Sequence, residues 1–119
     1  MINLPPTVRI FLATAPADMR RGFDGLASLT TSVIGENPLS GHLFVFRNRR
    51  GDRLKILYWD RDGLALWAKR LERGVFRFPT PRGHRLEVTP AELAAILEGI
   101  DLKQAQRQRR YVLPSATPS

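Results

Sequence analysis

Hydrophobic and polar residues follow one another along the chain in patterns that predict most of its secondary structure. Runs rich in β-branched and aromatic residues predict five strands, at residues 8–14, 42–46, 54–59, 75–78 and 85–88. In the run 54–59, Leu54 and Ile56 fall on one face and Leu57 on the other. Because both faces are partly apolar, we expect this strand to lie inside a sheet.

A short basic turn separates two of the predicted strands. Residues 47–53 read RNRRGDR, and Asn48 and Gly51-Asp52 are residues that favour turns. The strands on either side, 42–46 and 54–59, should therefore pair as an antiparallel hairpin.

The first segment with helical spacing follows Asp18, which is a suitable N-cap. Its apolar residues recur at intervals of three and four: Met19, Phe23, Leu26, Leu29 and Val33. Gly22 and Gly25 interrupt it, and each costs about 1 kcal/mol relative to Ala inside a helix. Either the helix begins late or another element packs closely against these glycines.

Two further helices are predicted downstream. Residues 63–73 place Leu64, Trp67 and Leu71 at helical spacing, with Gly74 as a stop and Asp62 as a cap. The last helix begins after Thr89, which forms a capping box with Glu92.

The order of these elements predicts an α+β fold. The expected domain is single, covers residues 1–102, and has a mainly antiparallel sheet, a central basic hairpin and about three packing helices. Strands and helices do not alternate regularly, so a doubly wound nucleotide-binding fold is not expected. Residues 103–119 are polar, basic and contain Pro, which predicts a flexible tail.

Composition excludes several classes of protein. The chain has 119 residues and no cysteine, which rules out disulfide frameworks and thiolate chemistry. His42 and His84 lack the spacing of metal ligands, so we predict neither a metal site nor a cofactor. No signal peptide or membrane-spanning run is recognisable, and the expected location is the cytoplasm.

The net charge of +8 points to a polyanionic partner, chiefly nucleic acid. Sixteen of the nineteen basic residues are Arg, whose planar fork matches phosphate. The other interpretation is a generally basic soluble protein.

Basic residues gather in three clusters. The candidate nucleic-acid-binding residues come from the first two: Arg47, Arg49, Arg50, Arg53, Lys55, Lys69 and Arg70. The third cluster, in the tail, contains Lys103, Arg107, Arg109 and Arg110. A charge run is also common on a merely solvated turn, and cations near Arg73 could complement a helix C-terminus.

Catalytic chemistry has little support. Asp60 and Asp62, with Lys55, form the best candidate set for a metal-dependent nuclease, but a two-residue carboxylate pair is a weak motif. No Ser has a plausible His and acid partner. Aromatic residues such as Trp59 and Trp67 could stack on unpaired bases, although their spacing fits a core at least as well.

Two blocks of the chain resemble a known family. DMRRGFDGL at 18–26 and LFVFRNRRGDRLKILYWDRDGLALWAKRLERGVFRFP at 43–79 closely resemble the small TnpB-type accessory proteins of the insertion-sequence-66 transposon family. The resemblance spans roughly residues 5–100 and leaves out the tail. It implies a transposition accessory protein encoded beside a separate transposase, with no catalytic residues to carry over.

Three functional hypotheses follow. In the first, the protein is a non-enzymatic factor that binds DNA or a transposase–DNA complex through its basic hairpin. In the second, it is an adaptor that holds the transposase without touching DNA. In the third and least favoured, it is a nuclease built on Asp60 and Asp62.

Overall fold

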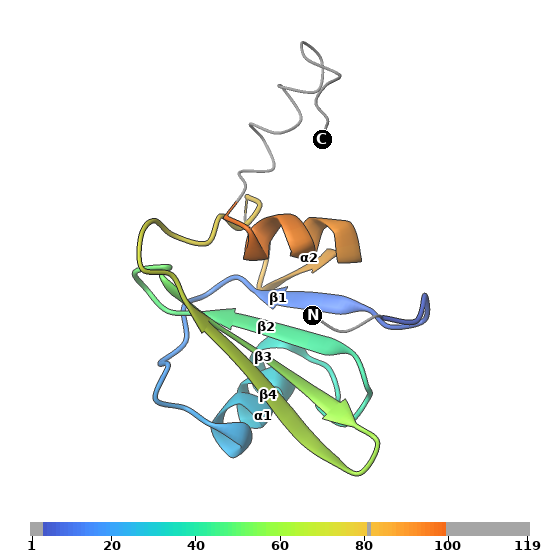
Figure 1. Ribbon diagram of the computed structural model, residues 1–119. Coiled ribbons are helices and arrows are strands. Elements are labelled where there is room, and N and C mark those ends of the chain that lie inside the picture. Colours follow the sequence, from blue (N-terminus) through green and yellow to red (C-terminus); the bar gives the residue numbers. More distant parts are fainter. Residues whose placement is uncertain (1–3, 81, 100–119) are drawn as a thin grey trace.

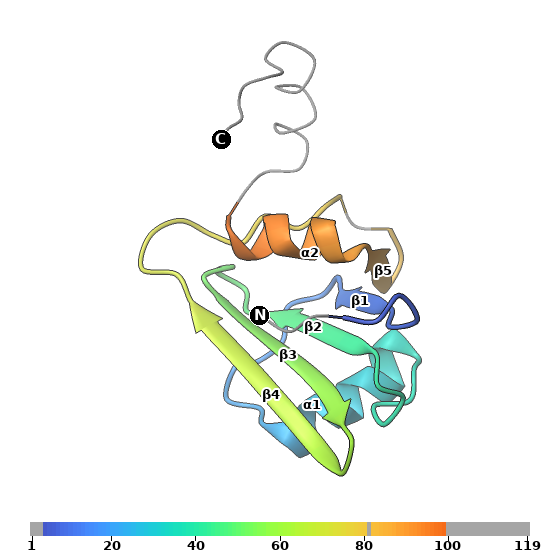
Figure 2. The same cartoon turned by 45° about the vertical axis from the view of Figure 1, so that its right-hand side comes forward.

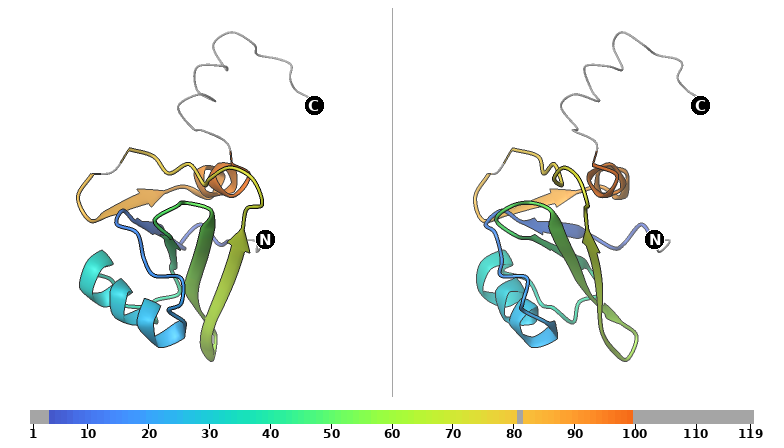
Figure 3. Two further views of the ribbon diagram at one scale, coloured as in Figure 1. Left: turned by 90° about the vertical axis from the view of Figure 1, so that its left-hand side faces the viewer. Right: turned by 60° about the vertical axis from the view of Figure 1, so that its left-hand side comes forward.

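A five-stranded sheet forms the centre of the molecule and carries one helix on each face (Figures 1 and 3). The structure is a computed structural model that describes residues 4–80 and 82–99. The elements are β1 (Ile10–Ala13), α1 (Phe23–Leu29), a π-helical turn (Thr30–Ile34), β2 (Leu43–Arg47), β3 (Arg53–Asp60), β4 (Gly63–Arg70), β5 (Arg85–Val88) and α2 (Pro90–Leu97).

The sheet is mixed, with strand order β4-β3-β2-β1-β5. β1 pairs with β2 in parallel, and the other three pairings are antiparallel. The α+β prediction is confirmed, whereas the sheet is not simply antiparallel and the described residues hold two α-helices rather than about three. β1 and β2 can pair in parallel because the chain that joins them passes over one face of the sheet and contains α1.

Alternation along the strands divides the core in two. Ile10, Val45 and Ile56 face α2, whereas Phe11, Phe46 and Leu57 face α1. β3 lies between β2 and β4 and is apolar on both faces, as the sequence predicts. Figure 2 shows α2 lying across one face of the sheet and α1 across the other.

The helix predicted at 63–73 is wrong, because this segment forms β4. All eight residues of β4 pair with β3, from Asp60↔Gly63 to Arg53↔Arg70. Leu64 and Leu66 pack on the α1 side, whereas Trp67 packs on the α2 side, which is the two-residue period of a strand. Because there is no helix here, the predicted role of Asp62 as a helix cap is also wrong.

The predicted strand at 75–78 is also wrong. This segment has no regular secondary structure, although Phe76 is only 2% exposed and anchors it to the α2-side core. Its apolar residues are buried by a crossing loop rather than by strand pairing. The strand predicted at 85–88 is confirmed as β5.

The helix after Asp18 begins late, which was one of the two alternatives. Gly22 is its N-cap, and Asp18 lies in the preceding loop. Within the part of the chain that the structure describes, no other helix or strand packs against these glycines: a Cβ on Gly25 would first meet the side chain of Arg21 in the preceding loop, and a Cβ on Gly22 would meet nothing within 4 Å.

The helix predicted after Thr89 is confirmed, with both hydrogen bonds of the capping box formed. No helix among the described residues is long and apolar enough to cross a membrane. The predicted tail, with Lys103, Arg107, Arg109 and Arg110, lies outside the described residues.

Candidate nucleic-acid interface

The turn between β2 and β3 is closed by its own side chains. Asn48 Nδ2 donates to Asp52 Oδ1 at 2.7 Å, and the Arg53 N–H donates to Asn48 Oδ1 at 3.0 Å. The bond from Asn48 lowers the pKa of the Asp52 carboxyl, and the charge of Arg50 adds to this effect. The backbone of residues 48–52 is thereby fixed without using any of the turn's Arg side chains.

The segment that follows β4 holds the same turn from outside. The Phe76 N–H donates to Gly51 O at 2.7 Å, and the Leu71 N–H donates to Asp52 O at 2.8 Å. Gly51 has φ +79°, and a Cβ there would lie 3.3 Å from Val75 Cβ. Both the backbone angle and the close approach therefore require glycine.

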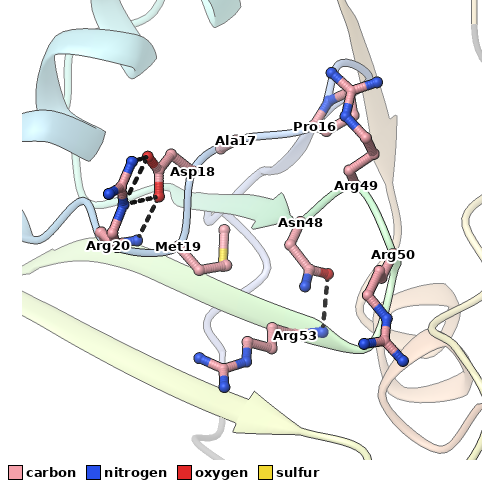
Figure 4. A pocket seen from close by; sticks show the side chains of 9 residues that line it. All are labelled: Pro16, Ala17, Asp18, Met19, Arg20, Asn48, Arg49, Arg50 and Arg53. Carbon is pink, nitrogen blue, oxygen red and sulfur yellow. Dashed lines mark hydrogen bonds and ion pairs between the residues drawn. The ribbon is translucent and has the colours of Figure 1, made fainter.

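Three arginines project from this fixed turn into solvent. Arg49, Arg50 and Arg53 are exposed, and no ion pair engages any of them within residues 4–80 and 82–99. They border an open hollow of about 560 Å³, whose other wall is the segment 16–20 (Figure 4). Basic groups therefore rim a concave surface that has a partly apolar wall.

A second, smaller hollow of about 230 Å³ shares Met19 and Arg53 with the first. Arg53 lies directly opposite Arg70 across β3 and β4, so both side chains project from the same face. Like charges in this position repel each other, and an anion between them would remove the repulsion. Arg70 also pairs with Glu72 at 3.2 Å, but both groups are exposed and this ion pair is weak.

We call Arg49, Arg50, Arg53 and Arg70 the basic face. Arg53 and Arg70 lie on the α1 side of the sheet, at the end where β3 begins and β4 ends, and Arg49 and Arg50 belong to the adjoining turn.

Lys55 supports the basic face from within. Its Nζ donates to Met19 O at 2.8 Å and to Arg21 O at 2.9 Å. These bonds tie the loop before α1 to β3 and so fix the far wall of the hollow. Lys55 is thus a positioning residue in this structure.

Asp18 shapes the same loop. Its carboxylate accepts the Arg20 N–H at 2.9 Å and the Arg20 guanidinium at 2.7 Å. These hydrogen bonds, chiefly the one from the guanidinium, lower the pKa of Asp18 to about 2 from 3.8.

Replacing Arg20 by Ala should raise the pKa of Asp18 towards its ordinary value of 3.8, because the main hydrogen-bond donor is lost while the backbone N–H at position 20 remains. In the wild type, the folded-state pKa is below the unfolded one. The stabilisation from Asp18 is therefore present above pH 3.8 and is lost as the pH falls towards 2. NMR titration of the Asp18 carboxyl in both proteins measures the shift, and an unchanged pKa in the variant would contradict the pairing.

Arg47 and Lys69 of the predicted set turn away from the basic face. The Arg47 guanidinium lies 4.6 Å from the Phe78 ring centre, and burial lowers its pKa. Lys69 Nζ donates to Leu97 O at 3.1 Å, at the C-terminal end of α2. Strand alternation was an available signal for Arg47, since Phe46 faces α1 and its neighbour must face α2. For Lys69 this signal was hidden, because the segment was predicted as a helix.

The predicted site did not include segment 16–20, which forms one wall of the larger hollow. Asp18 and Arg20 stand some thirty residues before the turn, and only the folded chain brings the two segments together. No local pattern marks that contact.

The structure does not assemble the predicted nuclease set. Asp60 and Asp62 are exposed at the β3–β4 turn, whereas Lys55 lies five residues back along β3, about 16 Å away at 3.3 Å per residue. Among the described residues, no three side chains of His, Cys, Asp or Glu are grouped to hold a metal ion.

Comparison with known proteins places the chain among relatives of similar length. The family described as "IS66 Orf2 like protein" matches residues 8–107. The chain is 44% identical over 110 residues to uncharacterized protein y4hO of Sinorhizobium fredii, which covers 92% of this chain and 96% of that protein. It is 40% identical over 108 residues to uncharacterized protein y4jC of the same organism, covering 91% and 92%. No solved structure matches.

Proposed function

The chain belongs to the IS66 Orf2-like family, as its resemblance indicated, and from this premise we propose that it is a non-enzymatic accessory factor for DNA transposition. It binds DNA, or the DNA of a transposase–DNA complex, through the basic face. The transposase of the same element is the expected protein partner.

The observation that carries this proposal is the cross-strand pair Arg53↔Arg70 beside Arg49 and Arg50. Arg53 and Arg70 project from one face, Arg49 and Arg50 border the adjoining hollow, and Glu72 is the acid paired with Arg70 among the described residues. Phosphate oxygens fit such a face because each guanidinium can donate two parallel hydrogen bonds. Most protein–DNA contacts are of this kind.

The fixed backbone of the turn favours a role in binding DNA over that of a turn that is merely exposed to solvent. Asn48, Gly51 and Asp52 hold the backbone by contacts that leave the neighbouring Arg side chains free. The entropy lost on binding is then mostly that of the side chains, because the backbone is already ordered.

Titration of the full chain against element-end duplex and random duplex tests the proposal. A face of four guanidinium groups that each contact one phosphate should give a slope of log K against log salt near −3.6, at about 0.9 counterions for each contact. Comparable affinities for the two duplexes would indicate charge-driven attraction, and tighter binding of the element end would indicate recognition. No binding to either duplex at low salt would contradict the proposal.

A second candidate is an adaptor that holds the transposase without DNA. Phe23, the first residue of α1, is 49% exposed, and large apolar side chains of this kind serve protein contacts. Co-purification of the transposase that survives nuclease treatment would favour the adaptor. Loss of the complex on nuclease treatment would favour the DNA-bound assembly.

A further inference from the structure

β4 is an edge strand that extends over eight residues. It pairs with β3 along its whole length and has no strand on its other side within residues 4–80 and 82–99. In Figure 3 the strand stands at the outer margin of the sheet. An edge of this length presents a row of backbone groups for pairing with another strand.

The register identifies which backbone groups point outward. The two-residue turn joins Asp60 to Gly63, a pair whose backbone groups face each other, and the Leu71 N–H donates to Asp52 O. Odd-numbered residues of β4 therefore bond to β3, since backbone direction alternates along a strand. The outward groups belong to the even-numbered residues Leu64, Leu66, Ala68 and Arg70.

The common protections of an edge are weak here. Sequence 63–70 contains no proline. Its one lysine, Lys69, is directed to Leu97 O and lies over the sheet rather than along its rim. Three of the four outward-facing positions carry apolar side chains. Such an edge can readily pair with a strand of another molecule.

We propose that β4 pairs antiparallel with β4 of a second copy of this chain and joins the two sheets into one. In an antiparallel pair, opposed residues lie on the same face, and only even-numbered residues have free backbone groups. A two-fold axis at Leu66 meets both conditions. It places Leu64 opposite Ala68, and Asp62 opposite Arg70, of the second copy.

Charge complementarity argues for a second copy as the occupant. The start of the strand is preceded by Asp60, Arg61 and Asp62, with a net charge of −1, and its end carries Lys69 and Arg70, with +2. Antiparallel pairing of two copies brings these unlike ends together twice. Opposite charges facing each other across strands stabilise a sheet, whereas a parallel arrangement would oppose like ends.

This symmetry has a geometric consequence. A two-fold axis perpendicular to the sheet keeps both α1 sides on the same face of the joined sheet. The two basic faces then lie on one side of the dimer, and the interface is isologous because both copies contribute the same strand.

Sedimentation of the full chain over a range of concentrations tests the pairing. The wild type should form a dimer, and Ala68→Pro should raise the dissociation constant about tenfold or more, because the two copies lose two hydrogen bonds at the interface. Ala68→Ser keeps the N–H and should dimerise like the wild type. A wild type that stays monomeric, or an Ala68→Pro protein that dimerises normally, would overturn the proposal.

A cross-linking experiment gives a second readout if Ala68→Pro fails to fold. The chain has no cysteine, so Leu66→Cys introduces a single thiol. Opposed residues at the axis are about 5.5 Å apart at Cα, which suits a disulfide. Oxidation should yield a covalent dimer for Leu66→Cys and little for Ala94→Cys, which lies on the exposed side of α2. Equal cross-linking of the two variants would exclude the proposed interface.

Discussion

Replacing Arg49 and Arg53 together by Gln is expected to weaken binding to duplex DNA about 60-fold at 0.1 M salt. Both guanidinium groups are exposed on the basic face and border the larger hollow. Each phosphate contact releases about 0.9 counterions, which is worth about eightfold in affinity at 0.1 M relative to 1 M salt. Two lost contacts multiply to the expected change. Fluorescence anisotropy with a labelled element-end duplex measures it.

A matched control separates the position of the charges from their number. Arg61 and Arg82 are exposed, and neither lines the hollows. Replacing both by Gln removes the same net charge as the Arg49→Gln/Arg53→Gln change. The Arg61→Gln/Arg82→Gln protein should bind within about threefold of the wild type, since rim charges contribute mainly through long-range attraction. Equal losses in both double variants would reject the basic face as the binding site.

Replacing Phe46 by Ala is expected to lower the free energy of unfolding by about 3–5 kcal/mol. Phe46 is 1% exposed on β2 and packs in the α1-side core with Leu26 and Leu57. The substitution leaves a cavity under α1, the helix that follows the loop containing Asp18. For a domain whose total stability is about 5–15 kcal/mol, this loss is a large fraction.

Phe23→Ala is the matched control for that variant. Phe23 is 49% exposed, so the same change of side chain should alter stability by only about 0.5 kcal/mol. Urea denaturation followed by circular dichroism compares the two. Similar losses at both positions would contradict the burial of Phe46 beneath α1 and the exposure of Phe23.

Local patterns predicted the elements whose signals are local. Strands β2 and β3 carry continuous apolar runs, and the capping box from Thr89 to Glu92 needs only four residues. β4 was misjudged because Leu64, Trp67 and Leu71 fit a helix while Leu64, Leu66 and Trp67 also fit a strand. Eight pairings with β3 decide between them, and those contacts are not local.

The sequence predicted that the candidate site is rich in basic residues, but it did not predict how their side chains are arranged. Arg49, Arg50 and Arg53 lie on the surface as a basic turn should, whereas Arg47 folds back onto Phe78. Lys55 was chosen for its charge, and the structure uses that charge to hold two backbone carbonyls. Which charged groups are free depends on tertiary partners that no spacing along the chain records.

The salt dependence of DNA binding, compared between the wild type and Arg49→Gln/Arg50→Gln/Arg53→Gln, tests the central claim most directly. If these three side chains each contact a phosphate, the slope of log K against log salt should become shallower by about 2.7 in the variant. Its circular dichroism spectrum should match that of the wild type, because no turn contact uses these side chains. Equal slopes and equal affinities for the two proteins would contradict the claim that this IS66 Orf2-like protein holds DNA through its basic face.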